Sequence, residues 1–431
     1  MIRGRYAVMG AGRAGLASAQ AIESVGGTAI VFDESDPRPV DWPDVRWNSG
    51  IPPDSEKFEA AIVSPGFRRD HPIYGWARQK GIELFGEIEL GYRLAQSPII
   101  AVTGSNGKST VTALTAHMLK AGGLDAIPCG NLAGTDSDRP LPLAAIQVPS
   151  DSILVAEVSS FQLESIIDFR PKVSIVTNIG REHLDRHATF EEYAAAKARV
   201  FENQREGDLA ILSESDREKL PEPKAQTCLT PKDVYKFIGK NIDFEHRNEW
   251  SLAGSHNLLN AMQAAVAASF FGAAKQAIEE SLVSYPGLPH RMEDLGEIDG
   301  VRFVNNSMCT NAAALEASLS ALSGPLIAIA GGKEKNDETD AIGRILAQRA
   351  QLSLLIGQSA QEIFNSMAQN GGKGKVCDNI AQAFEQAVAA SVRGDTVVLA
   401  PGCASFGEFT NFEERGDRFK SLVQGLKEQR S

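Results

Sequence analysis

A short glycine-rich loop between an apolar strand and a helix constrains the fold most strongly. The stretch Val102–Thr110, VTGSNGKST, follows the apolar run IIAV and opens the helical pattern STVTALTAHMLKAG. Backbone N–H groups and the helix dipole then point at an anion. The usual phosphate-binding pattern has a further glycine where this chain has Val102. The loop still predicts a phosphate site in an α/β sheet, with Lys108 at the β and γ phosphates and Ser109 on Mg²⁺. The alternative is a turn with a surface lysine.

Three series of alternating apolar strands and helical segments follow one another along the 431 residues. This rhythm is typical of parallel sheets with crossover helices. We therefore predict an α/β protein of three domains, each with a mainly parallel sheet. They are a Rossmann-like domain over residues 1–95, a P-loop ATPase domain over 96–287 and a Rossmann-like domain over 288–431. The Pro-Gly-Leu-Pro run at 286–289 is the expected connection between the last two.

The composition narrows the classes of partner. The net charge of −12 disfavours nucleic acid and anionic membranes, although local cations can still bind an anionic small molecule. The five cysteines form no CxxC pair, which favours reduced thiols in a cytosol over disulfides or a zinc site. No apolar run approaches the ~18 residues of a membrane span, and the N-terminus does not resemble a signal peptide. We expect a cytoplasmic protein.

A second glycine turn lies near the N-terminus. Gly10, Gly12 and Gly15 follow the strand YAVM and open a helix, and Asp33 ends the next strand. This is the spacing of the dinucleotide fingerprint, in which the turn holds a pyrophosphate and the acid reaches a ribose hydroxyl. A UDP-sugar meets the same requirement as NAD, because only a pyrophosphate at a helix N-terminus is needed. The alternative is a closely packed turn without a ligand.

Polar residues also follow two strands of the second series. Glu157 ends the apolar strand ILVAE, where a carboxylate is costly unless it meets a cation. His183, Asp185 and His187 cluster after the strand VSIV, and one ligand from each strand end would suit a phosphate-bound Mg²⁺. Lys197 lies in the helical pattern YAAAKARVF, where an exposed lysine is the ordinary expectation.

Seven motifs occur together and in order: TGSNGKST, EVSSFQLE, TNIGREHLDRH, YAAAKARVF, GSHNLLNAMQAA, GLPHRMED and PGCASFGEFTNFEERG. With them the chain resembles the Mur ligases over all three domains, and among these the type that joins glutamate to UDP-N-acetylmuramoyl-alanine. Their phosphate loop is similar to TGxNGK[ST], without the distal glycine. The resemblance implies an ATP-dependent amide ligase with an acyl-phosphate intermediate, acting on UDP-N-acetylmuramoyl-L-alanine and glutamate in cytoplasmic peptidoglycan synthesis. It also implies a monomer.

The resemblance assigns site residues position by position. The catalytic positions are Lys108, Glu157, His183 and Lys197. Those for ATP are Gly104, Ser105, Asn106, Gly107, Lys108, Ser109, Thr110, Asn257, Asn260, Arg291 and Asn306, with His256 beside them. Those for the UDP substrate are Gly10, Gly12, Arg13, Ala14, Asp33, Gly66, Asn131, Ser159, Gln162 and His183. Those for the amino acid are Thr310, Lys333, Lys335, Ser405, Phe406 and Phe412. Those for two Mg²⁺ ions are Ser109, Glu157, His183 and Lys197, the lysine being expected as a carbamate.

The chain departs from the glutamate-adding type in one loop. Where such ligases usually have DSKATN, residues 306–311 are NSMCTN, so that an acid has become Asn306 and a lysine Met308. The site is then impaired, or it takes another amino acid such as L-glutamate, or other cations replace the lysine. We expect the last, with Lys333 or Lys335 supplying the charge, because two carboxylates need fixed donors and cations. D-Glutamate is therefore the expected amino acid.

Two other functions compete. A ligase like folylpolyglutamate synthase shares the ATP loop but resembles only the second and third domains. A binding protein for UDP-sugar or NAD without catalysis would not need Lys108, Glu157, His183 and Lys197 at their motif positions. Release of ADP that depends on the UDP substrate and an amino acid distinguishes all three.

Overall fold

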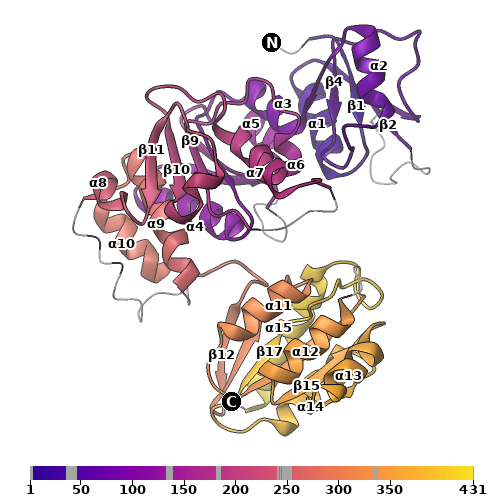
Figure 1. Ribbon diagram of the computed structural model, residues 1–431, viewed down its shortest axis with the longest axis vertical. Coiled ribbons are helices and arrows are strands. Elements are labelled where there is room, and N and C mark those ends of the chain that lie inside the picture. Colours follow the sequence, from indigo (N-terminus) through magenta and orange to yellow (C-terminus); the bar gives the residue numbers. More distant parts are fainter. Residues whose placement is uncertain are drawn as a thin grey trace. The chain divides into compact units, whose positions relative to one another are not determined.

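A computed structural model describes residues 3–34, 46–132, 139–180, 186–239, 242, 244, 255–333 and 338–430. The chain divides into two compact units, Met1–Tyr285 and Pro286–Ser431. The first unit contains two sheets and the second unit one (Figure 1). The expected roles of His183, Asp185 and Lys335, and of the side chain of His256, lie outside the described residues.

The first sheet is parallel throughout, in the order β3-β2-β1-β4-β5. Its elements are β1 (Arg5–Met9), α1 (Arg13–Ser24), β2 (Thr28–Asp33), β3 (Arg46–Ser49), β4 (Ala60–Val63), α2 (Pro72–Lys80), β5 (Glu83–Gly86) and α3 (Glu87–Leu94). Alternate side chains of β1 enter two separate apolar clusters, one on each face of the sheet. Strands buried on both faces are what the continuous apolar runs of the sequence predict.

The central sheet is also parallel, in the order β11-β10-β9-β6-β8-β7. Its strands are β6 (Ile99–Thr103), β7 (Ala126–Gly130), β8 (Ile153–Glu157), β9 (Val173–Val176), β10 (Leu209–Ser213) and β11 (Gln226–Thr230). Its helices are α4 (Lys108–Ala121), α5 (Leu141–Gln147), α6 (Ser160–Leu163), α7 (Phe190–Ala198), α8 (Val234–Ile238), α9 (Ser255–Phe270) and α10 (Lys275–Ser284), with 3-10 turns at Arg199–Phe201 and Glu214–Lys219.

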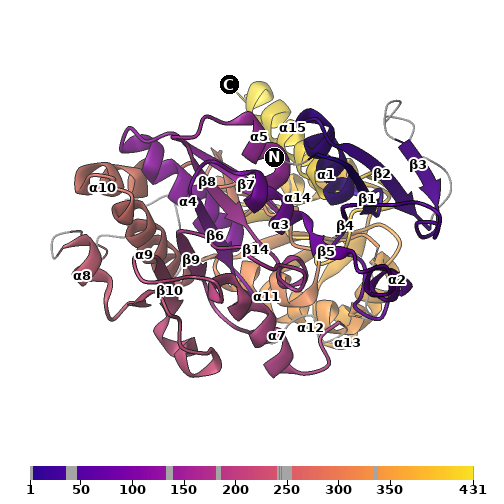
Figure 2. The same cartoon turned by 90° about the horizontal axis from the view of Figure 1, so that it is seen from above.

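Two groups of helices cover the faces of this central sheet (Figures 1 and 2). Helices α4, α9 and α10 pack on one face, and α3, α5 and α7 contribute to the cluster on the other. Helix α3 leads out of the first sheet and packs against α5 and α1, so it joins the two sheets of the first unit. Strand β6 lies in the interior of the sheet, which places its phosphate loop among the carboxyl ends of its neighbours.

The second unit contains a sheet in the order β12-β13-β17-β14-β15-β16, parallel except that β12 is antiparallel to β13. Its strands are β12 (Glu293–Ile298), β13 (Val301–Asn305), β14 (Leu326–Gly331), β15 (Leu352–Ile356), β16 (Gly374–Val376) and β17 (Thr396–Leu399). Its helices are α11 (Ala312–Ser320), α12 (Thr339–Arg349), α13 (Ala360–Gln369), α14 (Ile380–Ala390) and α15 (Phe412–Arg430). The predicted fold class, α/β with three mainly parallel sheets, is confirmed.

Two smaller expectations concern membranes and cysteines. Among the helices that the structure describes, none is both long enough and apolar enough to cross a bilayer.

All five cysteines fall within the described residues, where each is a buried free thiol. Burial raises the pKa of Cys129 to about 12, so this thiol is held in its unreactive protonated form.

Candidate active site

The phosphate loop between β6 and α4 is held in shape by the segment that follows β9. The Ser105 N–H donates to the Asn178 carbonyl at 2.9 Å, and the Asn106 N–H donates to the Asn178 side chain at 3.0 Å. The Thr177 hydroxyl donates to the Asn106 carbonyl at 2.6 Å. Gly104 has a φ of +142°, and a Cβ there would lie 1.9 Å from the Thr177 hydroxyl oxygen. Only glycine fits at this position, so the loop is a preformed cradle.

Helix α4 begins at this loop and carries the next predicted ATP residues. Gly107 precedes the helix with a φ of +83°, and a Cβ there would lie 2.5 Å from the Asn260 side-chain oxygen. Asn260 in turn donates to the Asn257 side chain at 3.0 Å, which connects α9 to the loop. Ser109 and Thr110 are buried in the first turn. The structure therefore brings both asparagines and the loop together at the N-terminus of α4, where an anion is favoured.

Two lysines meet at one backbone oxygen of the loop. Lys108 Nζ donates to the carbonyls of Gly104 at 3.0 Å and Ser105 at 2.7 Å. Lys197 Nζ donates to the same Gly104 carbonyl at 2.7 Å and lies 4.7 Å from the centre of the Tyr193 ring. Lys197 is only 2% exposed, so the expectation of an ordinary surface lysine is wrong. Its burial beside the phosphate loop brings together two predicted catalytic residues from α4 and α7.

Glu157 lies at the carboxyl end of β8, next to the loop-bearing strand β6. Its side chain is 3% exposed, and its Oε2 atom has no hydrogen-bond partner among the described residues. A buried carboxylate oxygen without a partner is costly, and a cation satisfies it. Asn131 is its neighbour, because the Asn131 N–H donates to the Glu157 carbonyl at 2.9 Å. Glu157 and Ser109 would suit an Mg²⁺ ion, whose remaining ligands would come from phosphate oxygens and water. No cluster of three His, Cys, Asp or Glu is found within the described residues.

The first glycine turn is tightly packed around Gly10 and Gly15. Gly10 has a φ of +97°, and a Cβ on Gly15 would lie 1.8 Å from the Gly10 carbonyl oxygen. A Cβ on Gly12, by contrast, would meet nothing within 4 Å, so this side of the turn is open to a ligand. Asp33 Oδ2 accepts the Ala11 N–H at 2.6 Å, which fixes the turn against β2.

Arginines connect this turn and the neighbouring loop to the central domain within the first unit. The Arg13 guanidinium donates to the carbonyls of Gly130 and Leu132, on either side of the predicted substrate residue Asn131. Arg186 donates to the Gly66 carbonyl at 3.2 Å and pairs with Glu164 at 3.0 Å. A cavity of about 630 Å³ adjoins this contact, and its lining includes four arginines: Arg68, Arg69, Arg186 and Arg199. These contacts therefore connect the predicted UDP-substrate residues Arg13 and Gly66, of the first domain, to the central domain.

Ser159 and Gln162 form a capping box at the start of α6. The Gln162 N–H donates to the Ser159 hydroxyl, and the Gln162 side-chain oxygen accepts the Ser159 N–H at 2.7 Å. The Gln162 Nε2 donates to Glu87 Oε1 at 2.6 Å. Glu87 begins α3 and is 2% exposed, and burial raises its pKa to about 7. Glu87 was not among the predicted site residues. Its carboxylate fixes the orientation of the Gln162 side-chain amide.

We expect the variant Glu87→Gln to be more stable than the wild type at pH 8 but not at pH 5. Burial raises the pKa of Glu87 to about 7, above the ordinary value of ~4.3 for the unfolded chain. The wild type therefore has its full stability below pH ~4.3, where the carboxyl is protonated in both states, and loses stability as the pH rises through about 7. The variant removes this loss, so its advantage grows by roughly 1–3 kcal/mol between the two pH values. Denaturant unfolding of both proteins at pH 5, 6, 7 and 8 measures it. Parallel pH curves would contradict the burial of a titrating carboxyl.

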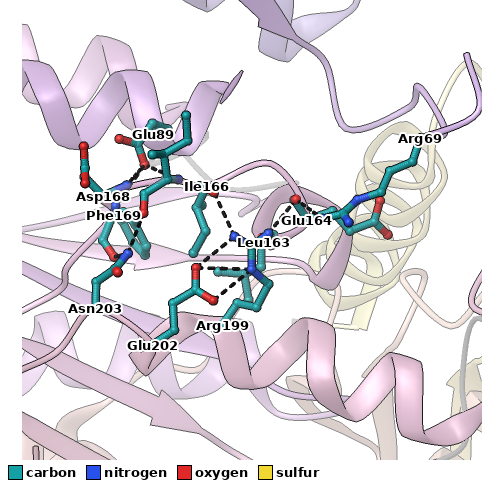
Figure 3. Close-up of polar contacts among 11 residues, drawn as sticks. Arg69, Glu89, Leu163, Glu164, Ile166, Asp168, Phe169, Arg199, Glu202 and Asn203 are labelled. Atoms are coloured by element: carbon teal, nitrogen blue, oxygen red, sulfur yellow. Dashed lines mark hydrogen bonds and ion pairs between the residues drawn. The ribbon is translucent and has the colours of Figure 1, made fainter. Parts of the chain in front are cut away.

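The segment after α6 is fixed from several sides by buried polar groups (Figure 3). One oxygen of Glu89, from α3, accepts the N–H groups of Ile167, Asp168 and Phe169 at 2.9–3.0 Å. The Arg199 guanidinium donates to three carbonyls along the same segment, those of Leu163, Glu164 and Ile166. Because Glu89 is fully buried, its contacts hold α3 and the segment of residues 167–169 together.

We expect Glu89→Ala to destabilise the first unit by about 3 kcal/mol or more, since it removes the buried carboxylate that accepts three N–H groups and pairs with Arg93. The matched control is Glu83→Ala. Both carboxylates pair with Arg93, but the Glu83 side chain is 46% exposed, and an exposed ion pair contributes at most ~1 kcal/mol. Thermal unfolding compares the two variants, and equal losses would contradict the assignment.

The second unit gathers the predicted amino-acid residues at the carboxyl ends of three adjacent strands. Residues 306–310 follow β13, 332–333 follow β14 and 401–406 follow β17. Lys333 and Ala404 exchange two backbone hydrogen bonds, which ties the last two loops together. Ser405 is buried, whereas Thr310, Lys333 and Phe406 are exposed. The structure thus places Thr310, Lys333, Ser405 and Phe406 on one edge of one sheet, whereas Phe412 begins α15.

Comparison with known proteins identifies the architecture. The Mur ligase middle domain matches residues 102–268, and the Mur ligase glutamate ligase domain matches residues 290–403. The UDP-N-acetylmuramoylalanine–D-glutamate ligase of Caldanaerobacter subterraneus is 34% identical over 98% of both chains, and that of Gloeobacter violaceus is 35% identical over 97% of this chain and 99% of its own. The chain belongs to the Mur ligase family.

Solved structures agree on the fold of this Mur ligase. The UDP-N-acetylmuramate-alanine ligase MurC of Thermotoga maritima has a TM-score of 0.60 at 15% identity and covers 99% of this chain and all of its own. A folylpolyglutamate synthase from the same organism has a TM-score of 0.56 at 14% identity, covering 78% of this chain and 93% of its own. The expected family, and with it an ATP-dependent amide-bond-forming enzyme, is confirmed.

The loop of residues 306–311, which is expected to depart from the glutamate-adding type, has satisfied polar contacts around Asn306. Asn306 is buried; its side-chain oxygen accepts the Met292 N–H at 3.0 Å, and its amide nitrogen donates to the Ser318 hydroxyl at 2.6 Å. The Ser318 hydroxyl itself donates to the Ala314 carbonyl. The Ser318 oxygen can therefore only accept a hydrogen bond from the side chain of residue 306. An asparagine amide can donate that hydrogen bond, whereas an ionised aspartate cannot. The role of Asn306 in ATP binding stays a prediction.

Met308, where the resemblance leads us to expect a lysine, packs against the predicted ATP residue Arg291. The Arg291 guanidinium contacts the Met308 sulfur through Nη2. A lysine at position 308 would place a second cation beside that guanidinium. The exchange thus removes a like-charge contact from the second unit, and it leaves the positive charge of the amino-acid site to other residues.

Proposed function

We propose that this chain joins D-glutamate to UDP-N-acetylmuramoyl-L-alanine with hydrolysis of ATP to ADP and phosphate, in the cytoplasm, as a monomer. The observation that supports the proposal most strongly is the full-length similarity to ligases of that name, at 34% and 35% identity over 98% and 97% of the chain. The buried Lys197 and Glu157 beside a preformed phosphate loop further support retention of catalysis over a binding role.

In the proposed reaction the substrate carboxylate attacks the γ-phosphorus of ATP, and ADP leaves. The amine of glutamate then attacks the acyl phosphate carbon, and phosphate leaves with formation of the amide. Lys108 and the N-terminal amides of α4 would bind and orient the phosphates. Ser159 and Gln162 would position the muramoyl part of the substrate, with Asn131 on the neighbouring strand.

We further propose two Mg²⁺ ions, one with Ser109 and Glu157 and a second with His183. Bound Mg²⁺ would neutralise the phosphate oxygens. Lys197 would serve as a carbamate, because an anion beside the phosphate loop can interact with a cation where an ammonium cannot. The reaction of a lysine with CO₂ proceeds through its neutral amine. The amino acid would bind through Thr310, Lys333, Lys335, Ser405, Phe406 and Phe412.

Release of ADP tests the proposed function. The purified enzyme with ATP and Mg²⁺ is expected to release ADP only when UDP-N-acetylmuramoyl-L-alanine and D-glutamate are both present. A folylpolyglutamate-type ligase would ignore the UDP substrate, and a binding protein would release none. The structural comparison favours release of ADP that depends on the UDP substrate, because the folylpolyglutamate synthase matches only 78% of this chain.

A further inference from the structure

A buried arginine lies beneath the predicted amino-acid site of the second unit. Arg415, in the first turn of α15, is 1% exposed. Its Nε donates to the Ser307 hydroxyl at 3.0 Å, one Nη donates to the Ser307 carbonyl at 2.8 Å, and the other Nη donates to the Cys403 carbonyl at 3.1 Å. A Cβ placed on Gly332 would lie 3.2 Å from Nη1, so the guanidinium also abuts the loop after β14. One side chain therefore contacts all three loops.

Each predicted amino-acid contact lies close in sequence to one of these points. Thr310 follows Ser307 by three residues, Ser405 follows Cys403 by two and Lys333 follows Gly332 directly. The Ser307 hydroxyl also donates to the Phe412 carbonyl at 2.7 Å, which adds the start of α15 to the same group.

Stability alone does not explain an arginine at this position. A cation in the first turn opposes the helix dipole, and a buried charge costs several kcal/mol unless it is well compensated. Burial lowers the pKa of Arg415 to about 10, which leaves it charged at neutral pH. Within the described residues its direct partners are carbonyl and hydroxyl oxygens, and no ion pair with a carboxylate is formed. The guanidinium therefore adds positive charge at the edge where a dicarboxylic amino acid is expected, and where Met308 is neutral.

We infer that Arg415 is the positioning residue of the amino-acid site. It fixes the loops after β13, β14 and β17 in the arrangement that receives the two carboxylates of the substrate, and its charge attracts them. This inference rests on the proposed function, because it assigns the amino-acid substrate to this edge of the sheet. Arg415 would thus determine the affinity for the amino acid without contacting it.

The test compares the KM values of the wild type for the amino acid, ATP and the UDP substrate with those of four variants. For Arg415→Met we expect a rise of about ten- to a hundredfold in the KM for the amino acid, since hydrogen bonds to a charged group are lost. The KM for the UDP substrate should change by less than about twofold, because its predicted residues lie in the first unit. The KM for ATP should rise less than that for the amino acid, because of the predicted ATP residues only Arg291 and Asn306 lie in the second unit. Arg415→Lys keeps the charge without the directed bonds, so we expect an intermediate value.

Two further variants keep the test decisive. Ser307→Ala removes one acceptor of Arg415 and is expected to raise the KM for the amino acid by about three- to tenfold even if Arg415→Met does not fold. Arg302→Met is the control, because Arg302 lies on β13 and pairs with Asp294 at the surface; we expect wild-type values.

Unchanged KM values for the amino acid in Arg415→Lys and Ser307→Ala would overturn the inference, as would an equal rise in all three KM values. Failure of the proposed function looks different, because the wild type would then release no ADP with the UDP substrate and any amino acid.

Discussion

Replacing Lys108 by alanine is expected to lower kcat by about a thousandfold or more while leaving the binding of UDP-N-acetylmuramoyl-L-alanine within about twofold of wild type. Lys108 now donates to the Gly104 and Ser105 carbonyls at the start of α4, where it is placed to reach phosphate oxygens. The pyrophosphate turn at residues 10–15 belongs to a different sheet, so its ligand should not depend on this lysine.

Two measurements separate these effects. Steady-state release of ADP gives kcat, and calorimetric titration gives the affinity for the UDP substrate. The control is Lys120→Ala, in the last turn of the same helix, where the side chain is exposed and we expect wild-type behaviour. A folded Lys108→Ala protein that no longer binds the UDP substrate would contradict the assignment of the two nucleotide sites to separate sheets.

Replacing Lys197 by alanine is expected to remove most activity, by about a hundredfold or more, with partial recovery in the presence of acetate. The removed side chain is buried and contacts the Gly104 carbonyl, so alanine leaves space beside the phosphate loop. If the lysine acts as a carbamate, a small carboxylate in that space restores the missing anion.

The matched variant is Lys197→Met, which fills the same space without charge. We expect it to be inactive and not to respond to acetate. Recovery of Lys197→Ala with ethylamine in place of acetate would show that an ammonium is needed and would contradict the carbamate. An unimpaired Lys197→Ala enzyme would exclude any catalytic role for this residue.

The phosphate loop and the sheets were predictable because they depend on local chemistry. A Gly-Lys-Ser turn between an apolar strand and a helix has one favourable arrangement, and β6 and α4 adopt it. Gly10 and Gly15 were equally informative, since the positive φ of Gly10 and the close packing of Gly15 against the Gly10 carbonyl leave no alternative residue. In each case the constraint lies within a few residues of the chain.

The residues that sequence analysis missed depend on distant contacts. Glu87 and Glu89 lie in the pattern GEIEL, which resembles a surface helix, yet both are buried because α3 packs against the central domain. Arg415 follows two glutamates in a polar helix start, and its burial results from contacts with loop residues 12 and 108 positions away in sequence. Lys197 was found only through the family resemblance, because the packing of α7 against the phosphate loop decides its exposure.

The amino acid that is added tests the central claim most directly. The purified enzyme is offered D-glutamate, L-glutamate, D-aspartate and L-lysine separately, with ATP and UDP-N-acetylmuramoyl-L-alanine, and the product is identified by mass and chirality. We expect ligation of D-glutamate, with Lys333, Lys335 and the buried Arg415 supplying the positive charge that Met308 lacks. Ligation of L-glutamate alone would contradict the D-specific assignment and attribute changed stereochemistry to the NSMCTN loop, and ligation of none of the four would contradict the proposed function itself.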